Sequence, residues 1–501
     1  MKNRIIYLTL SIFLLSAVSC KKDYLETAPT DSVDNSAVFT TTENADVALN
    51  GILRYMFERN GAQNRPGVGG ILLNFEFLGE DLHISSSNWF SSEGSYIRHR
   101  SVTNSMLVYS YRQFYRMIGN ANYIIDNIDN ASGSDADKRR IKAEALTIRA
   151  YSHFYLVQMF GKRYDATTKP NTQLGVPILI QSLDTNKPRA TVEEVYTQIV
   201  TDLEDAIALN VTTRFNQSHV NLNVAKGLRA RVALVMQDYP NAIKFSKEVI
   251  DSNAFPLMSV AAYQTGFNDV TQISEMMWAS MPIADQADQF GSFFSQIAFD
   301  ANTSFQRGNP KRINSALYDL IPADDVRKKM WEPTPNSTNF PLPTTAFARQ
   351  PYMSRKFAIK VKGAPTFGDV PLMRSSEMYL ILAEAYAKTP GQETLAKTTL
   401  QTLNLRRNPS SVLSLNTGQA LINEILVYRR VELWGEGFRF LDLKRLNLPL
   451  DRTAVPNLSA TALAALSNTS FVPAGDERWQ FLIPQDEIDA NSAIDASQQN
   501  P

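Results

Sequence analysis

The chain is nearly free of cysteine: Cys20 is the single one among 501 residues. One thiol cannot form a disulfide framework, and it excludes zinc sites that several cysteines hold together. Histidine is almost as scarce, with four residues, and no two of them lie within two helical turns of each other. Because metal-binding histidines usually converge from nearby helical positions, we expect no multi-histidine metal centre and no cofactor.

The sequence also lacks an excess of either charge, since 50 lysines and arginines balance 50 aspartates and glutamates. Proteins that bind nucleic acid normally carry a basic excess or a basic stripe, so this balance argues against that class. The hydrophobic fraction of 44% is ordinary for a folded protein and argues against extensive disorder. The length allows two or three domains, or one large domain.

The apolar run near the N-terminus is short. It covers residues 5–17, which is 13 residues, whereas a membrane-spanning helix needs about 20. Lys2 and Arg4 precede this run and small residues follow it, so residues 1–19 are predicted to be a secretory signal. A small-residue site that ends in Cys20 resembles a bacterial lipoprotein signal, in which the cysteine is acylated and anchors the chain. The alternative is an ordinary signal peptide with an incidental cysteine.

Helical patterns dominate the rest of the sequence. Apolar residues recur at three- and four-residue steps over 191–209, and Thr191 with Glu194 forms a predicted capping box at its start. Residues 138–160 repeat this spacing and are followed by Gly161, which suits the end of a helix.

Two further segments, 222–250 and 376–406, each contain two helical patterns separated by a break with proline. Paired short helices of this length resemble the tetratricopeptide arrangement. We therefore expect a mainly α fold with tetratricopeptide-like helix pairs as scaffold and a few short strands. Residues 60–105 and 253–375 are richer in glycine, proline, polar residues and aromatics, and we expect ordered, ligand-facing loops there.

Several motifs follow one another along the chain in an order that is highly specific. Two of the strongest are Glu144-Ala-Leu-Thr-Ile-Arg-Ala-Tyr and Arg429-Arg-Val-Glu-Leu-Trp-Gly-Glu-Gly-Phe. Cys20-Lys-Lys-Asp-Tyr-Leu stands before them, and Phe481-Leu-Ile-Pro closes the series. Together with residues 374–386, these motifs resemble the SusD/RagB family of outer-membrane nutrient-binding lipoproteins.

The resemblance implies a helical scaffold whose loop-rich face binds a nutrient, most often an oligosaccharide. It also implies a lipid anchor at Cys20, an outward-facing position on the outer membrane, and a SusC-like TonB-dependent transporter as partner. The regions expected from it are a signal peptide (1–19), a lipidated stalk (20–36), a SusD-like N-terminal helical region (37–255), and a RagB/SusD C-terminal region (256–501) with a loop-rich insert (256–375).

The segment 429–445 holds eight charged residues with Trp434 and Phe438 between them. A pair of carboxylates there would suit acid–base hydrolysis of a glycosidic bond. Arginine forks suit instead a buried ion-pair network that docks the last helix on the scaffold, and we favour this interpretation. The sequence has no G-x-S-x-G, H-E-x-x-H or P-loop motif, so no catalytic residue is assigned and we expect a protein that is not an enzyme.

Sugar binding requires flat aromatic rings against the C–H faces of the sugar and polar side chains for its hydroxyls. The polar segment 80–96 offers both kinds of side chain. The expected ligand contacts are Trp89 as the main platform, Asn88, Phe90, Asp81 and Tyr96 beside it, and Trp331 from a second, proline-rich segment. The alternative for each aromatic is that it packs on the scaffold.

The function predicted from the sequence is capture of an oligosaccharide and its delivery to the transporter. Three alternatives remain open at this point. They are a peptide-binding member of the same family, a surface glycoside hydrolase, and a helical-repeat scaffold without an aromatic-lined face.

Overall fold

The structure is a computed structural model that describes residues 39–87, 91–334, 347–362 and 366–501. Cys20, the predicted signal and the predicted stalk lie outside these residues. Within the part of the chain that is described, no helix is both long enough and apolar enough to cross a membrane.

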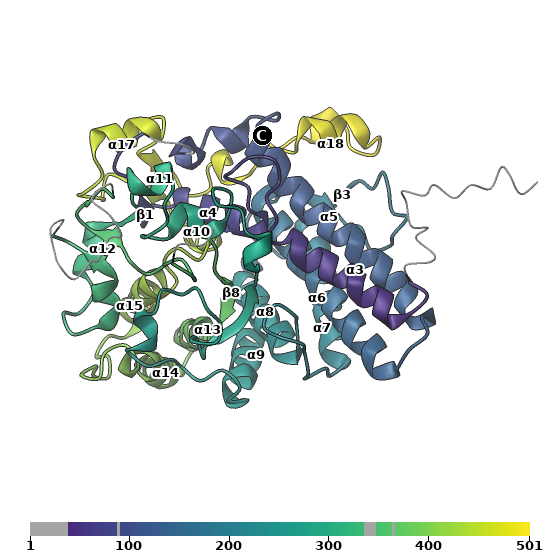
Figure 1. Ribbon diagram of the computed structural model, residues 1–501, viewed down its shortest axis with the longest axis horizontal. Helices are drawn as coiled ribbons and strands as arrows, with labels where there is room; N and C mark the ends of the chain where they lie inside the picture. The colour runs from purple at the N-terminus through teal and green to yellow at the C-terminus, as the bar shows by residue number, and fades with distance from the viewer. Residues whose placement is uncertain (1–38, 88–90, 335–346, 363–365) are drawn as a thin grey trace, which may run out of the picture.

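Helices form most of the regular structure, and Figure 1 shows their arrangement. The α-helices are α3 (Thr42–Tyr55), α4 (Gly67–Phe77), α5 (Ser105–Asn127), α6 (Asp135–Phe160), α7 (Val192–Ala208), α8 (Leu222–Val235), α9 (Tyr239–Asp251), α10 (Phe293–Ile297), α11 (Ser304–Arg307), α12 (Ser315–Asp319), α13 (Ser375–Ala387), α14 (Glu393–Leu405), α15 (Gly418–Glu432), α16 (Arg439–Arg445), α17 (Ala460–Ala465) and α18 (Gln485–Ala490).

The strands are short and are distributed over four small antiparallel sheets. One sheet has the order β1-β5-β7-β6, and the other three are the pairs β2-β3, β4-β8 and β9-β10. The strands are β1 (Leu82–His83), β2 (Leu174–Pro177), β3 (Arg189–Thr191), β4 (Met276–Ser280), β5 (Arg312–Ile313), β6 (Trp331–Glu332), β7 (Met353–Ser354), β8 (Val370–Arg374), β9 (Leu450–Asp451) and β10 (Phe471–Val472).

The helix predicted over 191–209 is confirmed as α7, and its capping box is present. The Thr191 side chain accepts a hydrogen bond from the backbone of Glu194, and the Glu194 side chain accepts one from the backbone of Thr191. The helix predicted over 138–160 is α6, which begins three residues earlier because Ser134 caps it, and which ends before Gly161 as expected.

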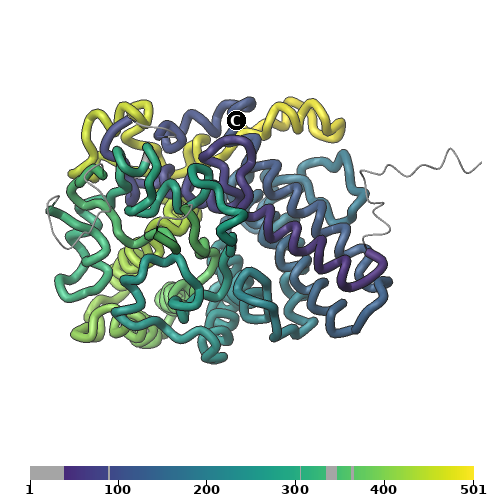
Figure 2. Tube along the Cα trace, viewed as in Figure 1, coloured from purple at the N-terminus to yellow at the C-terminus, as the bar shows by residue number. Residues whose placement is uncertain are grey.

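Both predicted helix pairs are also present, so the mainly α scaffold is confirmed. The segment 222–250 forms α8 and α9, and 376–406 forms α13 and α14. Helices α5 to α9 pack in succession, and α13 lies against α9, α14 and α15, so the pairs stack into a continuous layer. Figure 2 traces this layer from the blue helices at the right to the green helices at the lower left.

Helix α4 was not expected, because its sequence falls in a stretch predicted to be loop. It begins at Gly67, which has a positive φ of 49° and passes so close to Met56 that a Cβ atom there would lie 2.1 Å from the Met56 carbonyl oxygen. Ten of its residues are buried, and Phe75 stacks on Phe440 of α16 at 5.7 Å. Tertiary burial on all sides, rather than an amphipathic pattern, therefore stabilises this helix.

The main hydrophobic core draws on both predicted regions of the chain. Tyr151 of α6 meets Trp278 of β4 edge to face at 4.9 Å, and Phe440 and Phe481 belong to the same cluster. A second cluster around Trp331, Trp434 and Phe357 fills the loop-rich part, and a third lies among α13, α14 and α15. The N-terminal and C-terminal regions thus share one core and stabilise each other.

Three buried histidines make the stability of this core dependent on pH. Burial lowers the pKa of His83 to about 4, and burial lowers the pKa values of His99 and His153 to about 3. In the unfolded chain these groups take up a proton near pH 6.5. Each therefore contributes stability that is fully present above about pH 6.5 and is lost as the pH falls toward the folded-state pKa.

We expect His153→Leu to flatten this dependence. The variant should lose about 2 kcal/mol less of its free energy of unfolding than the parent chain between pH 7 and pH 5. Urea titrations at both pH values measure the difference. Met159→Leu, a buried change in the same helix that involves no titrating group, is the matched control. An unchanged pH dependence in His153→Leu would show that folding leaves the pKa of His153 near its value in the unfolded chain.

Candidate functional site

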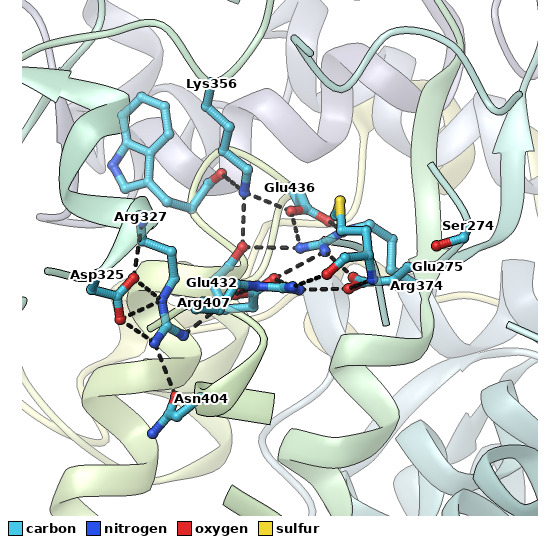
Figure 3. Close-up of polar contacts among 12 residues, drawn as sticks. Ser274, Glu275, Asp325, Arg327, Lys356, Arg374, Asn404, Arg407, Glu432 and Glu436 are labelled. Carbon is cyan, nitrogen blue, oxygen red and sulfur yellow. Dashed lines mark hydrogen bonds and ion pairs between the residues drawn. The ribbon is translucent and has the colours of Figure 1, made fainter. Parts of the chain in front are cut away.

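The charged segment 429–445 is the first candidate for a site, and most of its charged side chains are buried. Figure 3 shows the polar contacts of Glu432 and Glu436, and Arg374, at the end of β8, lies at the centre of these contacts. Its guanidinium donates to both carboxylate oxygens of Glu436 at 2.9 and 2.7 Å, and to Glu275 at 2.9 Å. It also donates to the carboxylate and the carbonyl oxygen of Glu432 at 3.0 and 2.9 Å. All five N–H donors of the arginine are therefore occupied.

Further cations complete the network around Glu432. Arg407 donates to Glu432 at 2.9 and 3.0 Å and to Glu275 at 2.6 Å. Although burial alone would raise it, the charges of Arg407 and Arg374 hold the pKa of Glu432 well below its usual value. Arg327 pairs with Asp325 at 2.6 Å and with Glu432 at 3.4 Å. Every carboxylate of this network is thus paired with at least one cation.

Lys356 also belongs to the network, and its ammonium group makes three hydrogen bonds. Its ammonium nitrogen donates to the carbonyl oxygens of Glu432 and Trp434, each at 2.8 Å, and to the carboxylate of Glu436 at 2.7 Å. Three acceptors match the three donors of an ammonium group. A buried lysine is in this way fully satisfied by two carbonyls and one carboxylate.

Two smaller clusters use the rest of the segment. Arg445 forms a bidentate pair with Glu384 at 2.7 and 2.8 Å and also donates to Asp442, which pairs with Arg429 at 2.8 Å. Despite burial, the charges of Arg429 and Arg445 lower the pKa of Asp442 to about 2. Arg439 pairs with Glu80 in the other cluster. The segment is therefore an ion-pair network, as the favoured interpretation predicted, and its carboxylates do not face an open cleft.

The loop between α15 and α16 is held from the side of α4. The Glu76 carboxylate accepts hydrogen bonds from the backbone N–H groups of Gly435, Gly437 and Phe438 at 3.2, 2.8 and 2.9 Å. Gly437 has a φ of 89°, and a Cβ atom on it would lie 2.7 Å from the side chain of Leu72. Only glycine allows this close approach of the loop to the helix.

Three of the expected ligand contacts lie in the interior, which corrects the expectation that they face a ligand. Asp81 is buried and accepts hydrogen bonds from Arg430. Tyr96 is buried, and its hydroxyl donates to the carbonyl oxygen of Leu78 at 2.8 Å. Trp331 is buried edge to face against Trp434, with ring centroids 5.6 Å apart. Asp81 and Tyr96 thus have polar partners inside the protein, and Trp331 has an aromatic one, so all three side chains pack against the interior.

The other three expected contacts, Asn88, Trp89 and Phe90, lie outside the described residues. The segment before them is fixed by one side chain. The Asn309 side-chain oxygen accepts hydrogen bonds from the backbone and hydroxyl of Ser85 at 2.7 and 2.9 Å, and its amide donates to the carbonyl oxygen of Ser86 at 2.8 Å. Asn309 therefore determines where the chain enters this segment.

The sequence did not reveal a cavity of about 390 Å³ at the carboxyl end of α6. Its walls come from three segments, residues 162–173, 443–448 and 475–480, and from Pro501. Lys162, Arg163 and Lys444 bring cationic groups to it. The basic pair Lys162-Arg163 directly after a helix was the available signal, but the three segments are too far apart in sequence to be combined without the fold.

In the described part of the chain, no group of three histidine, cysteine, aspartate or glutamate side chains is arranged to hold a metal ion.

We expect Arg374→Met to destabilise the protein strongly, because it leaves three buried carboxylates without their shared partner. Breaking a buried ion pair typically costs about 3–5 kcal/mol of the free energy of unfolding. Arg54→Met is the matched control, since Arg54 pairs with Glu58 on the surface and exposed pairs contribute about 0–1 kcal/mol. Urea unfolding of both variants measures the difference, and equal effects would contradict the central role of Arg374.

Comparisons with known proteins agree with the architecture described above. Residues 23–234 match the family described as "Starch-binding associating with outer membrane", and residues 293–501 match the family described as "SusD family". A curated relative, SusD-like protein P2 of Formosa agariphila, is 23% identical over 88% of this chain and 90% of its own length.

Solved structures show the same fold. A SusD-like carbohydrate binding protein of Bacteroides vulgatus is 25% identical and has a TM-score of 0.77, covering 92% of this chain and 99% of its own. Surface glycan-binding protein A of Bacteroides thetaiotaomicron, solved with laminarihexaose, is 19% identical and has a TM-score of 0.68, covering 92% of this chain and 100% of its own. With its stacked helix pairs, its buried ion-pair segment and these matches along both parts of its length, the chain belongs to the SusD family.

Proposed function

We propose that this protein binds an oligosaccharide at the outer-membrane surface and passes it to a SusC-like TonB-dependent transporter. The observation that carries this proposal is the family match itself, since the N-terminal match is to a family described as starch-binding and associated with the outer membrane. The B. vulgatus relative, which is described as carbohydrate binding, supports the same ligand class.

Within this proposal, the ligand contacts are Asn88, Trp89 and Phe90. Asn309 holds the residues before them through Ser85 and Ser86. After them, Glu93 accepts a hydrogen bond from Asn64 at 3.4 Å. Anchored flanks support the proposal because they reduce the conformational freedom that a short binding segment loses on contact with its ligand.

A capture role fits the disposition of the acidic groups better than hydrolysis does. A glycosidase needs two carboxylates about 5–9.5 Å apart on either side of an open sugar site. Glu432, Glu436 and Asp442 are instead buried and paired with arginines. The carboxylates of the charged segment therefore support the fold and leave ligand contact to other residues.

Attachment to the membrane is proposed to occur through acylated Cys20. One lipid chain alone gives weak and reversible binding, so stable attachment requires the multiple acyl chains that a lipoprotein cysteine carries. The protein would then present its binding segment outward and its ligand to the transporter.

We expect Trp89→Ala to weaken oligosaccharide binding by at least about tenfold, because a central aromatic ring commonly dominates the binding energy of such contacts. A glycan array followed by calorimetry on residues 21–501 measures the loss, with laminarihexaose and a set of peptides among the probes. Phe215→Ala is the matched control, since Phe215 is 66% exposed between α7 and α8 and lies outside the proposed site.

Three results would contradict the proposal. Equal glycan binding by Trp89→Ala and the parent chain would remove the proposed site. Binding of peptides and not of glycans would show that the ligand is a peptide and not an oligosaccharide. Release of reducing sugar by the purified protein would show that it is an enzyme.

The anchor is tested separately. We expect Cys20→Ala to abolish acylation and to move the protein from the membrane fraction to the soluble fraction, since it removes the only acylation site of this kind. Metabolic labelling with a fatty acid and membrane fractionation measure both effects. Unchanged labelling and membrane association would show that Cys20 is not the anchor.

A further inference from the structure

The cavity of about 390 Å³ at the carboxyl end of α6 is large enough for a small ligand, since such sites commonly span about 300–1,000 Å³. It continues into a neighbouring cavity of about 330 Å³, because Arg163, Asp165 and Asn447 line both. No described residue of the segment 80–96 lines either one. The two cavities therefore form a groove apart from the glycan contacts proposed above.

Lys444 of α16 reaches this groove with a buried side chain that is 7% exposed. Its ammonium nitrogen donates to the carbonyl oxygens of Gln158 and Gly161 at 2.6 and 2.8 Å. These carbonyls end α6, so the ammonium group caps the helix and interacts favourably with its dipole. Two of its three donors are thereby used.

The third donor of Lys444 has no carboxylate partner. Among the described residues, none of its oxygen neighbours within 4.0 Å belongs to a carboxylate. Consistent with this, burial without a compensating charge lowers the pKa of Lys444 to about 7. Removal of an ammonium group from water without a counter-charge is costly, so an anion in the cavity would be stabilised there.

Lys356 shows how the same arrangement looks when it is complete. Its nitrogen also donates to two backbone carbonyls, and its third acceptor is the Glu436 carboxylate at 2.7 Å. Lys444 likewise donates to two backbone carbonyls, but it lines the cavity and has no carboxylate acceptor among the described residues. The comparison indicates that the carboxylate of a bound ligand would supply the third hydrogen-bond acceptor of the Lys444 ammonium group.

The other charges along the cavity favour the same conclusion. Asp165 is neutralised by Arg163 at 2.5 Å, and Asp476 by Arg478 at 2.8 Å. Among the described residues, the side chains of Lys162, Glu477 and Lys444 remain at the wall without an ion pair. Pro501 also lines the cavity, and its carbonyl oxygen accepts a hydrogen bond from Arg100. The side-chain charges that are left free, two positive and one negative, therefore have a net positive sign.

We infer that this groove is a second ligand site and that it binds the carboxylate of an acidic sugar at the Lys444 ammonium, with Lys162 at its mouth. Neutral polar groups belong to the same cavity, since the side chains of Thr168, Gln173 and Asn447 line it. Hydroxyl and amide side chains bind sugar hydroxyls, and they favour a polyhydroxylated carboxylate over a bare inorganic anion.

The test uses residues 21–501 and D-glucuronate as probe, with D-glucose and inorganic sulfate for comparison, measured by calorimetry or ligand-observed NMR at pH 6. We expect saturable binding of D-glucuronate and at least about tenfold weaker binding of D-glucose, the usual effect of one charge-assisted hydrogen bond. Lys162→Glu should weaken D-glucuronate binding severalfold.

Lys329→Glu is the matched control, because it reverses an exposed lysine outside the groove and should leave binding unchanged. Lys444→Met should abolish binding; where that variant does not fold, the result for Lys162→Glu decides. Absence of saturable D-glucuronate binding, equal binding of D-glucose, or equal binding of sulfate would overturn the inference. Oligosaccharide binding by Lys162→Glu should match the parent chain, which separates this site from that of Trp89.

Discussion

The structure depends on one buried arginine whose five donors are all used. Arg374 joins three parts of the chain: β8 itself, Glu275 directly before β4, and the segment that holds Glu432 and Glu436 at the end of α15. A buried charge is tolerated only with complete partners, so the three parts can come together in one arrangement alone. This arrangement sets the loop that contains Gly437, which Glu76 then holds against α4. The position of α16, and with it Lys444, follows from these contacts.

The sequence was sufficient for the parts of the fold that have a local cause. Helix α7 has an apolar stripe and a capping box, and both determine it without help from the rest of the chain. The ion-pair network of the segment 429–445 could also be predicted, because arginines that alternate with carboxylates in sequence commonly form bidentate ion pairs. Helix α4 could not be predicted, since its glycines oppose a helix unless neighbours bury it on every side.

The candidate site was less predictable for a related reason. A polar, aromatic segment has the same composition whether its rings face solvent or the core. Tyr96 points inward because its hydroxyl donates a hydrogen bond to the carbonyl oxygen of Leu78. Asp81 points inward because it pairs with Arg430. Both partners become neighbours only in the folded chain. The groove at Lys444 was even less predictable, because three distant segments and Pro501 form its walls.

The shared core has a consequence for biogenesis. Phe440, Phe481 and Ile483 pack in the same cluster as Tyr151 and Phe154, so the helices made first lack part of their interior until the last stretch of chain arrives. Contacts so far apart in sequence form slowly, because a long loop must close before they contribute. We expect a nascent chain of this design to complete its core only after its C-terminal residues are made. A polypeptide whose core is still incomplete is easier to thread through a narrow export channel than a folded one.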